Sequence, residues 1–433
     1  MAEKIISLEL NEINFEYIQD YINQGKLPNF KYLFENFGYT RTSSEKCYQE
    51  LEPWIQWVTA HTGLSYEEHK VFRLGDIEKS NVKQIWELLE EKGISVAAVS
   101  PINASNKTTK AKFFIPDPWT KSKVSGSTSL KWVYDAIAQV VNDNAKQKIT
   151  FSSVLGLLLG ASLNTRYSSI PAYIRYLNSH RKGNAWARAL FLDRLLTDLF
   201  LTQWKKHKPQ FSSLFLNAGA HIQHHYLFSS PAYKGKIKNP AWYIKPGRDP
   251  VLEAYELYDK IVEEVLKEAK INNVRVILAT GLQQIPHHEF VIYYRLKEHE
   301  KFLRKIGISP AKVVPRMSRD FHVEFNSDAE AIHAENILLS VTDTSGEKLF
   351  SVDLRADNSL FVMLEYSKEI ANGFMAYLNG KPLSAFSDEV AFVAIKNGKH
   401  DEIGYYSDTK EHFTQPNSVM PLKDVFSRVV EAF

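Results

Sequence analysis

The sequence predicts an α/β protein with a mostly parallel sheet that carries helices on both faces. Apolar, β-branched runs such as Lys4–Leu10 (KIISLEL) and Val274–Thr280 (VRVILAT) are typical of buried strands. Longer helical patterns separate these runs, and VLEAYELYDKIVEEVLKEAK precedes the second of them. With 433 residues, the chain is long enough for one large α/β domain with additions.

Start and stop residues predict three helices in the first hundred residues. Pro28–Gly38 (PNFKYLFENFG) begins with proline and ends with glycine, and Glu52–Gly63 (EPWIQWVTAHTG) follows the same pattern. Asn81–Gly93 (NVKQIWELLEEKG) is the third helix and leads into the strand Ile94–Ser100 (ISVAAVS). This order is that of strands joined by crossover helices.

Two stretches interrupt the alternation within what we expect to be a single domain of residues 1–433. Residues 125–208 have mostly helical patterns with basic and aromatic residues, and they predict a helical insertion. Residues 289–390 mix helical patterns with the strand patterns DFHVEF, KLFSVDL and SLFVMLEY. They predict a smaller α+β subdomain in the C-terminal part.

Composition excludes some classes of partner. The 53 basic and 50 acidic residues leave a net charge of +3, so no strong field indicates nucleic acid. The longest apolar run, Val154–Ala161 (VLGLLLGA), is shorter than the ~20 residues that span a bilayer, and we expect a buried helix there rather than an interfacial segment. Because Cys47 is the only cysteine and the N-terminal residues lack a signal-peptide pattern, we expect a cytoplasmic protein.

Polar residues follow three of the predicted strands. In open α/β sheets, ligands bind beyond the carboxyl ends of the strands, so these residues should meet at one edge. They are Asn11 and Glu12, Asn217 and His221, and Thr280 and Gly281.

A series of segments occurs around these strand ends in a fixed order: IISLELNEINFEYI, GKLPNFKYLFENFG, LEPWIQWVTAHTG, LFLNAGAHIQHHY, VRVILATGLQ and AIKNGKHDEIGYY. In this order they resemble motifs of the alkaline phosphatase superfamily, closest to its type I phosphodiesterase/nucleotide pyrophosphatase and sulfatase-like branch. The resemblance implies a hydrolase or transferase acting on a phosphate or sulfate ester, with a glycan-linked ester as one option. Family chemistry uses two divalent cations and a Ser or Thr nucleophile at a helix start.

The chain departs from this pattern at the expected ligands. Asn11 stands where the first aspartate ligand belongs, and Asn217 replaces the aspartate of a D-x-x-x-H pair whose histidine is His221. Thr280 and Gly281 occupy the positions of an Asp-His pair. Amide oxygens bind zinc poorly compared with carboxylates, so the resemblance implies at most one metal, zinc or manganese, or none.

What remains is a possible single metal site. His221, His225 and His400 are the candidate ligands, with His224 as an alternative to His225. His221 and His225 are four residues apart and would share one helix face. The plainer alternative is that these imidazoles only line a helix.

Two carboxylates are the candidate catalytic residues. Glu52 lies near the position of the missing hydroxyl nucleophile, and Glu12 follows the first strand. Either could act as general acid or base, as a nucleophile in place of the hydroxyl, or as a further metal ligand. For Glu52 the alternative is an acidic residue at a helix start that is favoured by the helix dipole.

Asn11, Asn217, Thr280, Arg316 and Arg319 are the candidate substrate-binding residues. Both arginines lie in VVPRMSRDF, and their guanidinium groups suit phosphate or sulfate, although solvated surface charge is the alternative. The expected partner is a small anionic or glycan substrate, with neither nucleic acid nor a transmembrane segment. If the chain does not turn over substrate, it is a pseudoenzyme that binds an anionic or carbohydrate ligand; a metal-free enzyme using carboxylates on a sugar is a third alternative.

Overall fold

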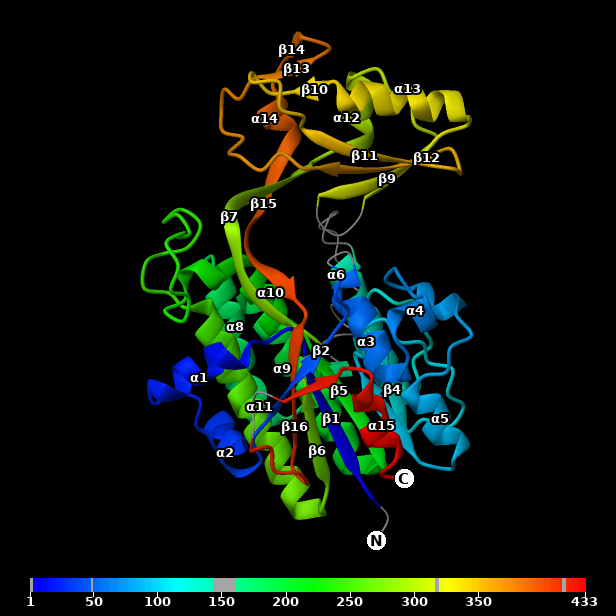
Figure 1. Cartoon of the computed structure of the whole chain (residues 1–433), viewed down its shortest axis with the longest axis vertical. Helices are drawn as coiled ribbons and strands as arrows, with labels where there is room; N and C mark the ends of the chain where they lie inside the picture. The colour runs from blue at the N-terminus through cyan, green and yellow to red at the C-terminus, as the bar shows by residue number, and fades with distance from the viewer. Residues whose placement is uncertain (1–2, 48–49, 143–159, 316–318, 415–417) are drawn as a thin grey trace. The chain divides into compact units, whose positions relative to one another are not determined.

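The structure is a computed structural model that describes residues 3–47, 50–142, 160–315, 319–414 and 418–433. The chain forms two compact units, shown in Figure 1. The main unit contains Met1–Pro286 and Gly398–Phe433, and the small unit contains His287–Asn397. The strands β7 (Gln283–Leu296) and β15 (Val390–Asp401) carry the chain from one unit to the other.

The main unit is built on an eight-stranded sheet with the order β17-β2-β16-β6-β1-β5-β3-β4. Neighbouring strands are parallel except where β16 pairs with β2 and β6. The strands are β1 (Ile5–Leu10), β2 (Thr40–Ser43), β3 (Val96–Val99), β4 (Phe113–Ile115), β5 (Phe211–Leu216), β6 (Arg275–Ala279), β16 (Ile403–Asp408) and β17 (Val419–Pro421). The predicted class, a mostly parallel α/β sheet, is confirmed.

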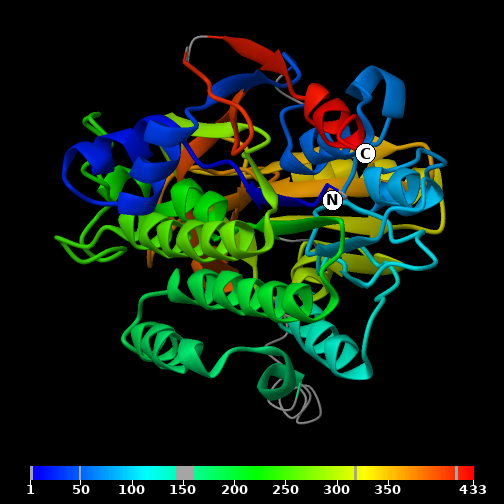
Figure 2. The same ribbon diagram turned by 90° about the horizontal axis from the view of Figure 1, so that it is seen from below.

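Helices cover both faces of this sheet (Figure 2). The helices of the main unit are α1 (Phe15–Asn23), α2 (Pro28–Asn36), α3 (Pro53–Thr62), α4 (Tyr66–His69), α5 (Ile85–Glu91), α6 (Thr128–Asn142), α8 (Ile170–Arg181), α9 (Ala187–His207), α10 (Ala218–Tyr226), α11 (Pro250–Asn272) and α15 (Asp424–Val430). Side chains alternate along β1, so Leu8 packs in the core that includes α9 to α11, whereas Ile5 packs with residues of α3, α5 and α15. The two apolar layers are separate cores on opposite faces.

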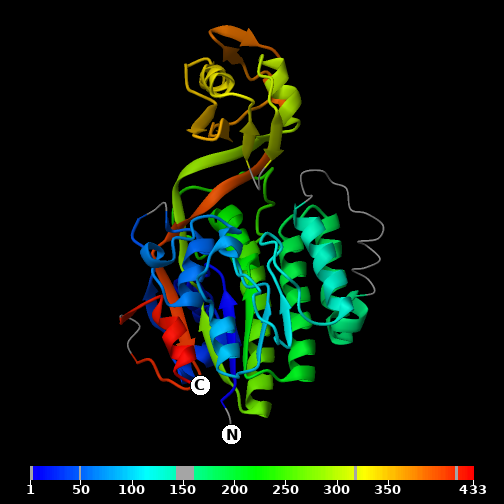
Figure 3. The ribbon, with the colours of Figure 1, turned by 90° about the vertical axis from the view of Figure 1, so that its right-hand side faces the viewer.

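The helices α6, α8 and α9 lie in the stretch for which the sequence predicts a helical insertion. Figure 3 shows α6 on the outer side of α9, away from the sheet. Most of the run Val154–Ala161, for which we expected a buried helix, lies outside the described residues. Within the described ranges, no helix combines the length and the apolar character that a bilayer crossing demands.

The small unit has antiparallel sheets and helices of its own. Its larger sheet has the strand order β11-β12-β9-β8, and a second sheet has the order β10-β13-β14. Its elements are α12 (His299–Lys305), β8 (Lys312–Pro315), β9 (Asp320–Glu324), α13 (Asp328–Leu339), β10 (Val341–Thr342), β11 (Phe350–Arg355), β12 (Ser359–Leu364), β13 (Ala376–Leu378), β14 (Lys381–Leu383) and α14 (Phe386–Glu389).

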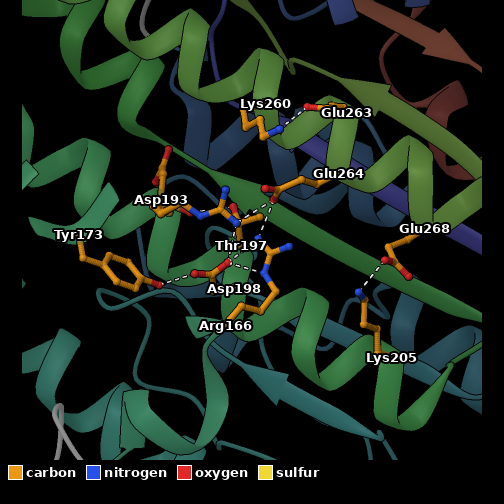
Figure 4. A network of polar contacts seen from close by, with 11 residues as sticks. Arg166, Tyr173, Asp193, Thr197, Asp198, Lys205, Lys260, Glu263, Glu264 and Glu268 are labelled. Carbon is orange, nitrogen blue, oxygen red and sulfur yellow. Dashed lines mark hydrogen bonds and ion pairs between the residues drawn. The ribbon is translucent and has the colours of Figure 1, made fainter. Parts of the chain in front are cut away.

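A charge network joins α9, α11 and the residues around the start of α8 within the main unit (Figure 4). Arg166 and Arg194 both donate to Asp198 Oδ1, at 2.6 and 2.5 Å, and both donate to Glu264 Oε2, at 2.7 and 2.8 Å. Tyr173 on α8 donates to the other oxygen of Asp198 at 2.6 Å. Two positive and two negative groups therefore compensate each other between α8, α9 and α11.

Breaking this network should destabilise the fold. Replacing Asp198 with Ala leaves the buried Arg194 with one carboxylate fewer, and we expect a loss of about 3 kcal/mol in the free energy of unfolding. The matched control is Lys260→Ala, which removes the exposed Lys260–Glu263 pair and should cost about 0–1 kcal/mol. Urea unfolding measures both variants, and equal losses would show that the network contributes no more than a surface ion pair.

Candidate metal centre

The strand ends meet as the sequence predicts, because β1 lies between β5 and β6. Beyond the paired residues, Asn11 N–H donates to the carbonyl of Leu216, and Glu12 N–H donates to that of Thr280, both at 3.0 Å. The side-chain amide of Asn11 donates to Asn217 Oδ1 at 2.8 Å. Polar residues from three distant parts of the chain are thus held together at the carboxyl edge of the sheet.

Glu12 has an unusual backbone at this edge. Its φ of 59° lies in the left-handed region, which is unfavourable for residues other than glycine. Hydrogen bonds hold it there, since its carbonyl accepts from Gln284 N–H at 3.2 Å and from Gln223 Nε2 at 2.9 Å. This conformation brings a carboxylate that is only 2% exposed into the core of the site.

Three ligand atoms of metal-binding type surround one point. The Nε2 atoms of His224 and His400 lie 3.1 and 3.2 Å from Glu12 Oε2, and 3.2 Å from each other. Among the described residues, these are the His, Cys, Asp and Glu side chains that gather three ligand atoms within 4.8 Å. The side chains of Glu12, His224 and His400 are 2%, 29% and 13% exposed, respectively. The site is therefore buried at Glu12 and reaches solvent at His224.

Each imidazole has an oxygen on its far side. His224 Nδ1 lies 3.4 Å from the carbonyl of Gly398, and His400 Nδ1 lies 3.6 Å from Glu52 Oε2. An acceptor beside Nδ1 assigns the proton of a neutral imidazole to that atom and leaves a lone pair on Nε2. A cation bound between the rings and Glu12 would meet both lone pairs, as in metal-binding histidines, whereas in its absence the rings donate to the Glu12 carboxylate from Nε2.

Glu12 keeps its negative charge at this position. Burial alone would raise the pKa of Glu12, but the charges of His400 and His224 and the hydrogen bonds from their rings hold it well below 4.5. Amide donors add to this, with Asn11 Nδ2 at 2.8 Å from Oε1 and Gln284 Nε2 at 2.6 Å from Oε2. The carboxylate therefore suits a ligand that remains ionised.

The donor set fits a divalent ion. Two imidazoles and one carboxylate form the protein ligands of known catalytic zinc sites, which leave a further position for water. Tetrahedral bonds of about 2.0–2.1 Å place ligand atoms about 3.3–3.4 Å apart. The three separations of 3.1–3.2 Å differ from this by a few tenths of an ångström.

The helix register places His224 in this cluster, and neither His221 nor His225 is part of it. At about 100° per residue, His221 is turned about 60° and His225 about 100° away from His224 around α10. Those two rings contact each other instead, with centroids 4.9 Å apart. The D-x-x-x-H spacing indicated the first turn of α10, whereas β15 approaches its last turn.

The remaining positions named by the resemblance are engaged in structural contacts. Asn11 Oδ1 accepts from Trp57 Nε1 at 2.7 Å, and Thr280 Oγ1 accepts from Tyr405 N–H at 2.8 Å. Gly281 has a φ of 72°, and a side chain there would meet the Trp57 ring at 2.9 Å. The indole thus fills the space beside Asn11 and Gly281.

Glu52 and the two arginines occupy different settings. Glu52 stands at the start of α3, one-third exposed, beside His400. Arg319 belongs to the small unit, where its guanidinium lies 4.2 Å from the centre of the Tyr293 ring. Arg316 lies outside the described residues.

Three supporting residues were not found from the sequence. Gln284 binds Glu12, and Gly398 lets β15 pass close by, since a side chain at 398 would come within 2.1 Å of Gln284 Oε1. Asp193 on α9 accepts the N–H of Ala218 at 2.7 Å and the hydroxyl of Tyr258 at 2.7 Å, which fixes the start of α10. A lone aspartate in the apolar helical run FLDRLL was a usable signal for a buried partner.

The fold and this centre together define an α/β protein with a mononuclear metal-type site at the strand ends. No model of a protein family matches the chain. No curated protein matches it either.

Solved structures of similar architecture exist. The chain is similar to the phosphonoacetate hydrolase from Sinorhizobium meliloti 1021, at 12% identity and a TM-score of 0.44, covering 99% of this chain and 95% of that one. Murine ectonucleotide pyrophosphatase/phosphodiesterase 5 in complex with AMP has 10% identity and a TM-score of 0.44, covering 99% of this chain and 94% of that one. Alkaline phosphatase from the Antarctic bacterium TAB5 has 13% identity and a TM-score of 0.41, covering 99% of this chain and 97% of that one.

Asp193 predicts a pH-dependent contribution to stability. Burial raises the pKa of Asp193 from 3.8 to about 6, although hydrogen bonds from Ala218, Tyr258 and Asn217 oppose the shift. Since this pKa is raised in the folded state, the contribution of Asp193 is fully present below about pH 4 and falls as the pH rises to about 6. Relative to Asp193→Asn, the wild type should therefore lose on the order of 2–3 kcal/mol of unfolding free energy between pH 4 and pH 7.

Urea unfolding of both proteins at the two pH values measures this difference. Asp135→Asn, at an exposed position on α6, is the matched control and should change the unfolding free energy by less than about 0.5 kcal/mol at either pH. A gap between wild type and Asp193→Asn that stays constant with pH would contradict the prediction.

Proposed function

We propose that this chain is a hydrolase of phosphate or sulfate esters that works with a single divalent metal ion held by Glu12, His224 and His400. The observation that carries the proposal is the triangle of Glu12 Oε2 and two imidazole Nε2 atoms, with sides of 3.1–3.2 Å. The ester class is what the ordered motifs imply. Zinc, manganese and iron(II) are all compatible with two imidazoles and a carboxylate.

Charge explains why an anionic substrate would require the ion. Glu12 and Glu52 bring two carboxylates to the site, so the protein alone would repel a phosphate or sulfate group. A bound divalent ion would offset this charge, polarise an ester oxygen and lower the pKa of a water molecule. The residues of the chain then have to hold the ion, admit the ester and accept a proton.

Glu52 is the residue of the chain that can take the proton. The start of α3 carries Glu52 and Pro53 where a hydroxyl nucleophile would be needed, so water is the attacking group. The Glu52 carboxylate is one-third exposed and would accept one proton of that water while the bond from the water oxygen to phosphorus or sulfur forms. The bond from phosphorus or sulfur to the ester oxygen breaks, and the departing oxygen takes up a proton to leave as an alcohol. The contact of Glu52 with His400 also fixes the orientation of that ring.

Metal analysis with matched histidine variants tests the proposal. The purified wild type, stripped of metal and reconstituted with zinc, manganese or iron(II), should bind one ion per chain and hydrolyse p-nitrophenyl phosphate, its diester or the sulfate. His224→Ala should lower metal affinity at least about 100-fold and abolish turnover, because it removes a ligand. His221→Ala, on the same helix outside the cluster, should retain the ion and the activity.

Glu52→Gln separates binding from chemistry. It should weaken metal affinity by about 10–100-fold at most, because it alters a group behind a ligand, and should lower turnover even at saturating metal. Loss of metal in His221→Ala but not in His224→Ala would contradict the assigned site. Turnover by metal-free protein would contradict the role of the ion.

The alternative is a pseudoenzyme that binds its ligand without turnover. One observation favours it: Asn11, Thr280 and Gly281, which stand at ligand positions of the resembling family, are engaged in contacts with Trp57 and β16. This alternative predicts that phosphate or sulfate raises the melting temperature of the metal-loaded protein, since a ligand that binds the native state stabilises it, while none of the three esters is hydrolysed.

A further inference from the structure

The helix α8 turns an apolar face to solvent. Ile170, Ile174 and Leu177 are 47%, 54% and 49% exposed and lie at positions i, i+4 and i+7, which is one face of a helix. Just before them in the chain, Leu163 and Tyr167 are 67% and 80% exposed. We call these five residues the α8 stripe. Single exposed apolar residues are common on protein surfaces, but five within 15 positions are typical of an interaction surface.

This face is not the one that holds α8 in place. Tyr173 and Tyr176 lie on the inner side, where Tyr176 is buried and the Tyr173 ring contacts Phe191 at 5.2 Å. The Tyr173 hydroxyl also donates to Asp198 in the network of Figure 4. The inner side therefore makes the packing contacts and the hydrogen bond that hold α8 in place. The apolar residues of the stripe are on the other side of the helix, where they can contact a different surface. Figure 2 shows this helix at the periphery, outside α9.

The stretch of sequence that carries the stripe has charged side chains of one sign. From Asn144 to Leu192 the sequence contains no Asp or Glu, but it contains seven Lys and Arg residues. The whole chain is nearly balanced, with 53 basic and 50 acidic residues, so this stretch is a marked local departure. Arg175, Arg181 and Lys182 are exposed on or directly after α8, and Arg188 is exposed in the first turn of α9. An apolar helix face with a basic border matches the surface of an anionic bilayer.

We propose that the α8 stripe and its basic border form a binding site for the surface of membranes that contain anionic lipids. Ile170, Ile174 and Leu177 enter the boundary between headgroups and acyl chains, Tyr167 lies at the headgroup level, and the basic side chains contact lipid phosphates. A second copy of the chain fits less well, because facing stripes would bring the basic side chains of both copies together. This inference does not depend on the proposed hydrolase function.

Co-sedimentation of the full chain with lipid vesicles tests the site. Vesicles of phosphatidylcholine with one third phosphatidylserine should bind the wild type at least about tenfold more strongly than phosphatidylcholine alone, and the difference should shrink at high salt. The double variant Ile174→Ser with Leu177→Ser should bind both kinds of vesicle at least about tenfold more weakly, since it removes two inserted side chains. Arg175→Gln with Arg181→Gln should remove most of the preference for phosphatidylserine.

Ile271→Ser is the matched control, because Ile271 is 69% exposed on α11, far in sequence from the stripe. It should bind vesicles like the wild type, and thermal unfolding of every variant establishes that the fold is intact. Equal binding by the Ile174→Ser/Leu177→Ser variant and the wild type would overturn the proposal. So would a concentration-dependent dimer that this variant abolishes, combined with no vesicle binding, because the stripe would then be a contact between copies.

Discussion

The site depends on one buried carboxylate. Glu12 is 2% exposed and ionised, and a charge in such a position is tolerated only with compensating partners. The partners come from distant parts of the chain: His224 from α10, His400 from β15 and the amide of Gln284 from β7. Asp193 fixes the start of α10, and the absence of a side chain at Gly398 lets β15 approach. Much of the polar structure at the carboxyl edge of the sheet thus serves to hold one negative charge in place.

Sequence patterns were sufficient for the main sheet because its strands are buried on both faces. IISLEL and VRVILA read as continuous apolar runs, and they became β1 and β6 as neighbours in the sheet. The strand-end rule then brought Asn11, Glu12 and Asn217 to one place. Strand ends can be located in this way because they follow from chain direction alone, without knowledge of side-chain orientation.

The choice among three histidines could not be made in the same way. His221, His224 and His225 differ only by their rotation around α10, and the face that meets the site is set by where β15 crosses that helix. That crossing depends on Gly398 and Gln284, which lie far from α10 in sequence. The charge network at Asp198 and the exposed face of α8 could likewise not be predicted from the sequence, because both depend on how α8 packs against α9. The main unit therefore has a polar centre at the strand ends and, elsewhere, the helix α8 with an exposed apolar face and exposed basic residues.

Anomalous X-ray diffraction from crystals grown with zinc or manganese tests the metal centre most directly. We expect one peak about 2 Å from Glu12 Oε2 and from the Nε2 atoms of His224 and His400. If there is no peak, and the three atoms still lie within hydrogen-bonding distance, protons on the imidazoles balance Glu12. The centre would then be a buried ion-pair cluster and the proposed chemistry would be wrong.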